Sequence, residues 1–265
     1  MQATTRTGER QAKLWGARAR DWADINEPQF QALYDAVLGA LDVQSGSEHL
    51  DLGCGSGLAA AVAIARGASV AGLDATPELL EIARERAPAG EFHLGDLEET
   101  PFADSRFDTI VGFNSFQFAG DPAAALREAA RVAKPGAPIA VATWGRPDQC
   151  EAATVLRDYA ELMPPPPPGA VGPFALSEPG TLEAFVEQAG LKPGEPVDVE
   201  VVWTYSDVEQ ALRGFNSSGP ATMARTVASE EEIDARVGAG LEQFRQENGS
   251  VRLRNVFRYL IARSG

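Results

Sequence analysis

The residues best suited to bind a ligand lie in the stretch LDLGCGSG, residues 50–57. A carboxylate, Asp51, precedes three glycines at alternate positions, Gly53, Gly55 and Gly57. Glycine lets the backbone adopt positive φ and approach a ligand closely. A carboxylate beside such a loop repels phosphate and attracts a positive charge. The stretch therefore predicts a loop that binds a neutral or cationic group, through direct contact or a bound water.

The spacing of the glycines separates this loop from a dinucleotide-binding fingerprint. That fingerprint is G-x-G-x-x-G, and Leu58 stands here where its third glycine would be. A nicotinamide-dependent oxidoreductase is therefore disfavoured, although it stays as an alternative. A flavodoxin-like sheet that uses glycine only for a tight turn is a second alternative.

The elements around the loop alternate between strand and helix. We expect Thr76 and Asp121 to cap two of the helices and Gly67 to end another. Such alternation implies crossover connections and a doubly wound, mostly parallel sheet of the α/β class. The expected strands are 49–52, 69–74, 92–94, 107–113 and 138–143, and the expected helices are 30–41, 58–66, 77 onward and 122–133.

The second half of the chain has a different pattern. Two late strands, 197–205 and 251–262, enclose a mostly helical stretch and predict an antiparallel pair at one sheet edge. We expect the helices to cover the mouth of the site. The five prolines at 164–168 predict a stiff connector between helices 151–162 and 181–189. We expect the chain to form one domain with two parts. Residues 1–145 hold the N-terminal lid helices and the cofactor-binding core, and residues 146–265 form the remainder of the same domain.

The motifs, taken in order, resemble those of class I S-adenosylmethionine-dependent methyltransferases, specifically small-molecule enzymes with a methyltransferase type 11/25-like domain. After LDLGCGSG, the similar segments are VAGLDAT, GDLEETPF, FDTIVGFNSFQF and LREAARVAKPGA, and the resemblance runs from about residue 15 to residue 143. It implies a Rossmann-like, seven-stranded sheet with a helical lid inserted in the C-terminal half. It also implies S-adenosylmethionine as cofactor and S-adenosylhomocysteine as product.

The resemblance also assigns roles to residues outside the loop. It implies that Asp74 binds both ribose hydroxyls and that Ala75 packs on the adenine. Asp96 would bind the adenine amino group, the Leu97 amide would bind a ring nitrogen, and Asn114 would lie near the methionine part.

The N-terminal segment LWGARARDWA is similar to a helix that closes over the cofactor in small-molecule members of the family. By that resemblance, Trp15 and Arg20 would contact the methionine end of the cofactor. Together with the loop, the predicted cofactor-binding residues are Asp51, Gly53, Gly55, Gly57, Asp74, Ala75, Asp96, Leu97, Asn114, Trp15 and Arg20.

The predicted function is transfer of a methyl group from S-adenosylmethionine to a small organic acceptor. The alternative is a protein of the same fold that binds S-adenosylmethionine without methylating, as a regulatory module or for another reaction type. The intact set of Asp51, the glycines, Asp74 and Asp96 disfavours a degenerate module.

No residue is assigned a catalytic role. His49 and His93 fall in strands and are interpreted as structural, and two histidines cannot form a histidine metal cluster. The aromatic residues could line an acceptor pocket or pack in the core. They are Trp144, Trp203, Tyr159, Tyr205, Phe116 and Phe118, and the base candidates are Asp148, Tyr159 and Tyr205.

The composition of the chain limits the classes of molecule that it is expected to bind. The 265-residue chain has a net charge of −15, which disfavours nucleic acid and anionic membrane surfaces. It has two cysteines without metal-ligand spacing, no apolar signal-peptide segment and no apolar run long enough to span a bilayer. We expect a cytoplasmic protein with an apolar or aromatic acceptor, and the oligomeric state stays open.

Overall fold

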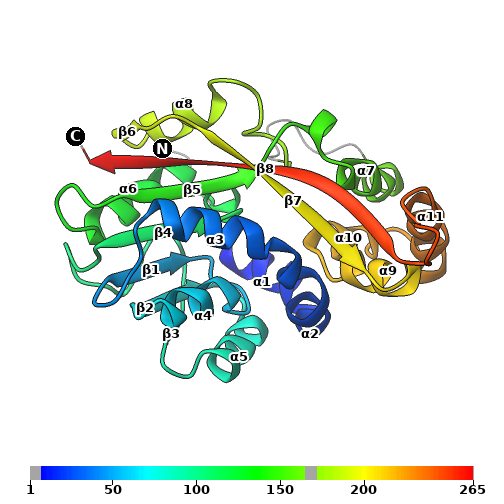
Figure 1. Cartoon of the computed structure of the whole chain (residues 1–265), viewed down its shortest axis with the longest axis horizontal. Helices are drawn as coiled ribbons and strands as arrows, with labels where there is room; N and C mark the ends of the chain where they lie inside the picture. Colours follow the sequence, from blue (N-terminus) through cyan, green and yellow to red (C-terminus); the bar gives the residue numbers. More distant parts are fainter. Residues whose placement is uncertain (1–6, 165–171, 265) are drawn as a thin grey trace.

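An eight-stranded sheet runs through the computed structural model, which describes residues 7–164 and 172–264 (Figure 1). The strand order is β3-β2-β1-β4-β5-β8-β6, with β7 also paired to β8. Strands β1 to β5 are parallel, and β8 is antiparallel to its neighbours. The predicted doubly wound, mostly parallel α/β fold is confirmed. The parallel strands are β1 (Glu48–Leu52), β2 (Ser69–Asp74), β3 (Glu91–Leu94), β4 (Thr109–Phe113) and β5 (Ile139–Trp144).

Helices pack on both faces of this sheet and enclose two apolar cores. One core lies against α3 (Gln31–Ala40), α4 (Leu58–Ala65) and α5 (Pro77–Arg86). The other lies against α6 (Pro122–Val132) and α8 (Thr181–Glu187). The central strands are apolar on both faces because both are covered.

The sheet has eight strands instead of the seven predicted because a short strand that was not expected precedes the expected strand 197–205. Strands β6 (Leu191–Pro193) and β7 (Val197–Tyr205) both pair with β8 (Val251–Ser264). Between the two pairings, one extra residue enters the β6–β7 side, which is a β-bulge. Gly194 lies in it, and a Cβ there would stand 2.8 Å from the Ile261 carbonyl oxygen. Sequence periodicity does not reveal such an insertion.

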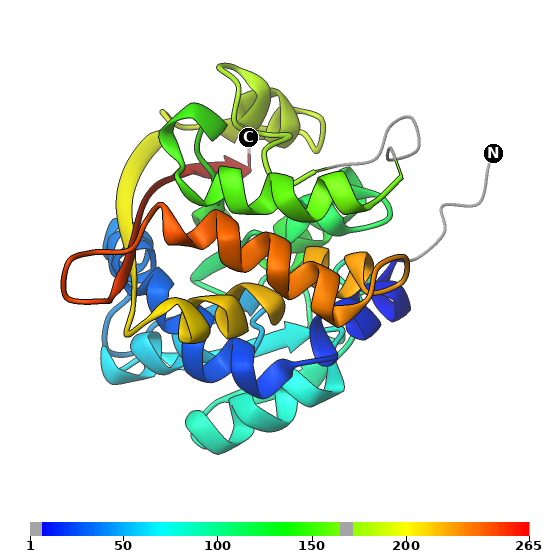
Figure 2. The ribbon, with the colours of Figure 1, turned by 90° about the vertical axis from the view of Figure 1, so that its right-hand side faces the viewer.

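Helices from both ends of the chain gather at the edge where the parallel strands end (Figures 1 and 2). From the N-terminal side come α1 (Gly8–Gly16), α2 (Ala19–Asp21), the π-helical turn η1 (Trp22–Asn26) and the 3₁₀ turn η2 (Glu27–Phe30). From the C-terminal half come α7 (Ala152–Leu162), α9 (Val208–Asn216), α10 (Gly219–Ala224) and α11 (Glu230–Glu242). Two further 3₁₀ turns are η3 (Phe116–Phe118) and η4 (Pro147–Gln149).

The proline run continues beyond Pro164 into residues that the structure does not describe, so the expected connector lies outside the described residues. Within the described ranges, no helix has the length and apolar content needed to cross a membrane.

Candidate functional site

The glycine loop leaves the carboxyl end of β1 in a conformation that side chains disfavour. Gly53, Gly55 and Gly57 have φ of +80°, +54° and +78°. A Cβ on Gly57 would lie 2.8 Å from the Cβ of Ala83 in α5, and one on Gly53 would overlap Ser115. The glycines therefore serve both the turn and the close packing of the loop between α5 and the segment after β4.

Asp74, at the end of β2, fixes the middle of this loop. Its Oδ2 accepts the Gly55 N–H at 2.9 Å, and its Oδ1 accepts the Thr76 N–H at 2.8 Å. Burial raises the pKa of Asp74, while these backbone donors act in the opposite direction. Thr76 occupies the predicted cap position of α5, but its side chain makes no capping hydrogen bond, and its hydroxyl bonds Asp74 instead.

Asp51 is a buried acid for which the described residues supply no ion-pair partner. Its side chain is 1% exposed, and neither carboxylate oxygen has a hydrogen-bond partner within the described residues. Burial raises the pKa of Asp51 to about 8, with further contributions from Glu27 and Asp74. A buried carboxylate without a partner is costly, and a cationic ligand would remove that cost. This feature fits the ammonium or sulfonium group of S-adenosylmethionine.

Ala75 and Asp96 lie directly beneath α1. A Cβ on Gly8 would stand 3.2 Å from Asp96 Oδ2 and 3.6 Å from the Cβ of Ala75. The other oxygen of Asp96 accepts the Glu98 N–H at 3.0 Å. Leu97 is partly buried against the core on the α6 side. Of the residues expected to bind adenine, Ala75 and Asp96 thus lie under the N-terminal helix.

Asn114 follows β4 with φ of +50°, a conformation uncommon for a residue other than glycine. Its N–H donates to the Ala142 carbonyl at 2.8 Å, while its side-chain Oδ1 is buried without a partner in the described part of the chain. Because β1 and β4 are parallel neighbours, Asn114 and Asp51 come at the same edge of the sheet. Both keep a buried acceptor atom free there.

The two predicted N-terminal contacts have different surroundings. Trp15 packs edge-on against Trp22, with ring centroids 4.8 Å apart. Of these two tryptophans, Trp22 is the one that approaches the loop, since its Nε1 lies 3.9 Å from where a Cβ on Gly55 would be. Arg20 is 59% exposed and pairs with Glu85 at 2.9 Å, apart from the loop residues. The contact of Arg20 with the methionine end stays a prediction.

Most of the aromatic residues considered for an acceptor pocket pack in the core. Phe116, Tyr159 and Tyr205 are at most 1% exposed. Trp144 and Trp203 lie in one aromatic cluster, with ring centroids 5.5 Å apart. Among these candidates, only the side chain of Phe118 is half-buried, and the Phe118 carbonyl accepts the Thr7 hydroxyl at 2.7 Å.

The candidate bases already have structural partners. The Tyr159 hydroxyl donates to Asn216 Oδ1 at 2.9 Å, and the Tyr205 hydroxyl donates to Asn26 Oδ1 at 2.8 Å. Burial raises the pKa of both tyrosines, which disfavours proton release. Asp148 is exposed and pairs with Arg146 at 2.8 Å.

The histidines are also engaged in local contacts. His49 Nδ1 lies 2.8 Å from Thr109 Oγ1, and burial lowers the pKa of His49 to about 4. His93 lies beside Glu91, 2.6 Å away. The described residues also bring no group of three or more His, Cys, Asp or Glu side chains together in a way that could hold a metal.

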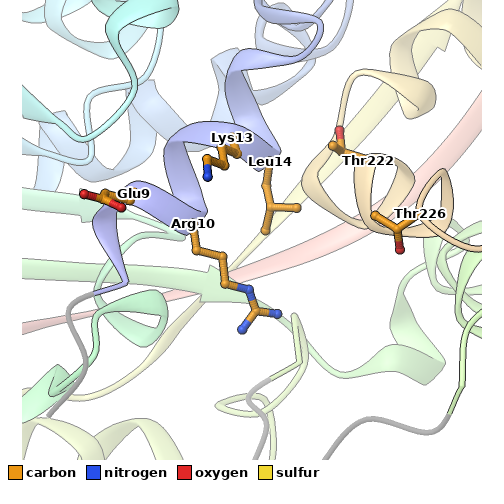
Figure 3. Close-up of a pocket in the computed structure, with 6 residues that line it drawn as sticks. All are labelled: Glu9, Arg10, Lys13, Leu14, Thr222 and Thr226. Atoms are coloured by element: carbon orange, nitrogen blue, oxygen red, sulfur yellow. The ribbon is translucent and has the colours of Figure 1, made fainter.

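A separate pocket of about 460 Å³ lies between α1 and α10 (Figure 3). It is lined by Glu9, Arg10, Lys13, Leu14, Thr222 and Thr226. Helical spacing turns Arg10, Lys13 and Leu14 away from Gly8, which faces Asp96. This pocket is therefore on another side of α1 from Ala75 and Asp96.

The parallel sheet with helices on both faces, and a ligand loop at the carboxyl end of β1, define a Rossmann-like nucleotide-binding fold. Residues 50–141 match the family model of a methyltransferase domain. Together with the methyltransferase relatives, this match supports a methyltransferase domain of the class I S-adenosylmethionine-dependent type in this part of the chain.

Two relatives and one solved structure illustrate the similarity. The chain is 33% identical over 142 residues to malonyl-[acyl-carrier protein] O-methyltransferase of Serratia marcescens, covering 54% of this chain and 52% of that protein. It is 32% identical over 136 residues to demethylmenaquinone methyltransferase of Streptomyces griseus, and the match covers 51% of this chain and 59% of that protein. The chain thus spans about half the length of these curated relatives. The crystal structure of a putative methyltransferase from Bacillus halodurans shares the fold, with a TM-score of 0.57 and 19% identity. The superposition covers 87% of this chain and 97% of that one.

Proposed function

We propose that this protein transfers a methyl group from S-adenosylmethionine to a small organic acceptor. The observation that carries the proposal is the buried, unpartnered carboxylate of Asp51 next to the glycine loop. Asp74 and Glu27 add negative charge close by, as their effect on the pKa of Asp51 indicates. A ligand with a sulfonium and an ammonium group suits this electrostatic environment better than a dinucleotide phosphate does.

Each part of the cofactor has proposed contacts. Asp74 would bind the ribose hydroxyls, since a carboxylate can accept two hydrogen bonds from a diol. Ala75, Asp96 and Leu97 would surround the adenine beneath α1. Asp51 and Asn114, with their free acceptor atoms, would bind the aminoacyl end.

The cofactor supplies an electrophilic methyl group on its sulfonium, and S-adenosylhomocysteine is the product after transfer. The protein's own part is to hold the acceptor in line with that group and to exclude water. Turn η1 approaches the loop through Trp22, and α1 lies over Ala75 and Asp96. We propose that α7 and α9 to α11 form the lid on the other side. In this organisation, residues 1–145 carry the cofactor site and residues 146–265 complete the same domain.

We propose an apolar or aromatic acceptor. The support comes from Trp15, Trp22 and Phe118, which are half-buried aromatic side chains. Trp22 approaches the loop at Gly55, Trp15 packs against Trp22, and the Phe118 carbonyl accepts the Thr7 hydroxyl just before α1. Such side chains can offer apolar contact to a ligand while staying accessible. The net charge of −15 argues against nucleic acid as the acceptor.

The test is calorimetric titration of the purified protein with S-adenosylmethionine, S-adenosylhomocysteine and NADH. We expect micromolar binding of the first two and no binding of NADH; binding of NADH alone, or of none, would overturn the proposal. Methyl-labelled S-adenosylmethionine is then incubated with the protein and fractions of small molecules from cells. Label transfer supports a methyltransferase, and binding without transfer supports the alternative of a non-methylating binding protein.

A further inference from the structure

A buried ion pair lies directly behind the glycine loop. Glu27 begins η2 and its side chain is 4% exposed, while Arg86 ends α5 and its side chain is 21% exposed. Both side chains bind Ser56, the residue between the second and third glycines. The Ser56 hydroxyl donates to Glu27, and Arg86 Nη1 donates to both the Ser56 carbonyl and its Oγ at 2.9 Å.

The same pair also holds the turn that covers the loop. Arg86 Nη2 donates to the Ala23 carbonyl at 2.8 Å, inside the π-helical turn η1. Such turns are rare and often occur at functional sites. Trp22, in the same turn, also approaches Gly55, where a Cβ would lie 3.9 Å from Trp22 Nε1 and 3.5 Å from Glu27 Oε1. One guanidinium therefore connects α5, the glycine loop and the covering turn.

Glu27 further supports the helix that follows the loop. Helix α4 begins after Gly57 without a capping side chain at its N-cap position. The Leu58 N–H, in its first turn, acts on Glu27 and lowers the pKa of that carboxyl against the effect of burial. A carboxylate at a helix N-terminus satisfies a free donor and interacts favourably with the helix dipole. Glu27 thus acts on the loop from both ends, through Ser56 and through Leu58.

We propose that Glu27, Ser56 and Arg86 form a latch that holds the glycine loop and its covering turn in the geometry that binds the cofactor. Glu27 and Arg86 are then positioning residues, which act on the aminoacyl end of the cofactor through Ser56. This inference rests on the proposed function. It adds that cofactor affinity depends on a segment before residue 50, outside the part of the chain that matches the family model.

The experiment compares Glu27→Gln with Glu85→Gln. Both variants make the same chemical change, and both acids pair with an arginine that joins the N-terminal segment to α5. Glu85 is 62% exposed and is not in contact with the loop. We expect the Kd for S-adenosylmethionine to rise at least about tenfold in Glu27→Gln and to stay within about twofold in Glu85→Gln.

A purely structural role would give a different result. It would lower the Tm of Glu27→Gln but leave the Kd of its folded fraction unchanged, which would overturn the proposal. Removing one partner of a buried pair can prevent folding, so Ser56→Ala is the second variant. It keeps the ion pair, and we expect a rise in Kd of about threefold or more. An unchanged Kd in Ser56→Ala would also overturn the latch.

Limited proteolysis supplies a readout of the covering turn. S-adenosylhomocysteine should protect residues 7–26 from cleavage in the parent and in Glu85→Gln, and protect them less in Ser56→Ala. Equal protection in all three proteins would contradict the latch. If the parent itself fails to bind either cofactor form, the proposed function fails; if it binds and the variants match it, only the latch fails.

Discussion

The Asp74 carboxylate accepts the Gly55 N–H at 2.9 Å and so joins the end of β2 to the middle of the loop that leaves β1. Two further bonds strengthen this junction, because Gly53 and Cys54 both donate to the Leu73 carbonyl. The loop is therefore held in its left-handed turns by the neighbouring strand before any ligand binds. Such preorganisation lowers the entropic cost of binding, because less of the loop has to be ordered by the ligand.

Asp74→Ala should raise the Kd for S-adenosylmethionine at least about tenfold, since it removes a charged contact to the ribose and the anchor of Gly55. The measurement is calorimetric titration. The control is Asp104→Ala, which removes a carboxylate that is 76% exposed and pairs with Arg131. An unchanged Kd in Asp74→Ala would refute the ribose assignment.

Much of the cofactor core was predictable because its signals are local. The predicted strand 69–74 coincides with β2, and strand 197–205 coincides with β7. Apolar runs between glycine and proline punctuation specify such elements without reference to the rest of the chain. The spacing of Asp51, Gly53, Gly55 and Gly57 is likewise contained in seven residues.

The contacts behind the loop were not predictable because their partners are distant in sequence. Glu27 and Arg86 are 59 positions apart, and Ser56 and Arg86 are 30 apart. A glutamate and an arginine on helices are most often solvated, so neither residue type indicates a buried pair. For Tyr159 and Tyr205, residue type also left two roles open, and only the contacts with Asn216 and Asn26 show that they pack inside.

The buried Asp51 should make the ligand-free protein less stable as the pH rises. Its pKa is raised from 3.8 to about 8, so the folded protein keeps a proton that the unfolded chain releases. The unfolded state then binds fewer protons between about pH 4 and pH 8, and stability falls across that range. Asp51→Asn removes this loss, so without ligand its Tm should exceed that of the parent at pH 8.5. A lower Tm at that pH would contradict the assignment of a strained, unpartnered carboxylate.

The same group should release a proton when a cationic ligand binds. The ionised form of Asp51 is the one that attracts the ligand, so affinity for S-adenosylmethionine should increase between pH 6 and pH 7.5, by at most about tenfold per pH unit. Calorimetry in buffers of different ionisation enthalpy measures the proton release. In Asp51→Asn the affinity should be lower and this pH dependence should weaken. A parent whose affinity does not change over this range would exclude Asp51 from the ligand contact.

Removal of the helix over Asp96 should weaken cofactor binding. Deleting residues 1–24 takes away α1 and its contact with Ala75 and Asp96, and we expect a rise in Kd of about fivefold or more because the adenine loses its cover. Gly8→Leu is the point variant, since its side chain would enter the space held by Asp96 Oδ2. Lys13→Ala, on another side of α1, is the control and should bind as the parent does. Equal affinities for all the proteins would show that α1 is not part of the site.

Asn114→Gly should separate stability from binding. Glycine adopts the φ of +50° at this position without the steric cost that a side chain carries, so the Tm should stay the same or rise. The variant also removes the buried Oδ1 that has no partner in the described residues. If that oxygen binds the aminoacyl end, the Kd for S-adenosylmethionine should rise by about threefold to tenfold.

Ser105→Gly is the matched control, because exposed Ser105 has φ of +55° far from the loop in sequence. Its Tm should change in the same direction while its Kd stays constant. A Kd for Asn114→Gly equal to that of Ser105→Gly would remove Asn114 from the proposed cofactor site.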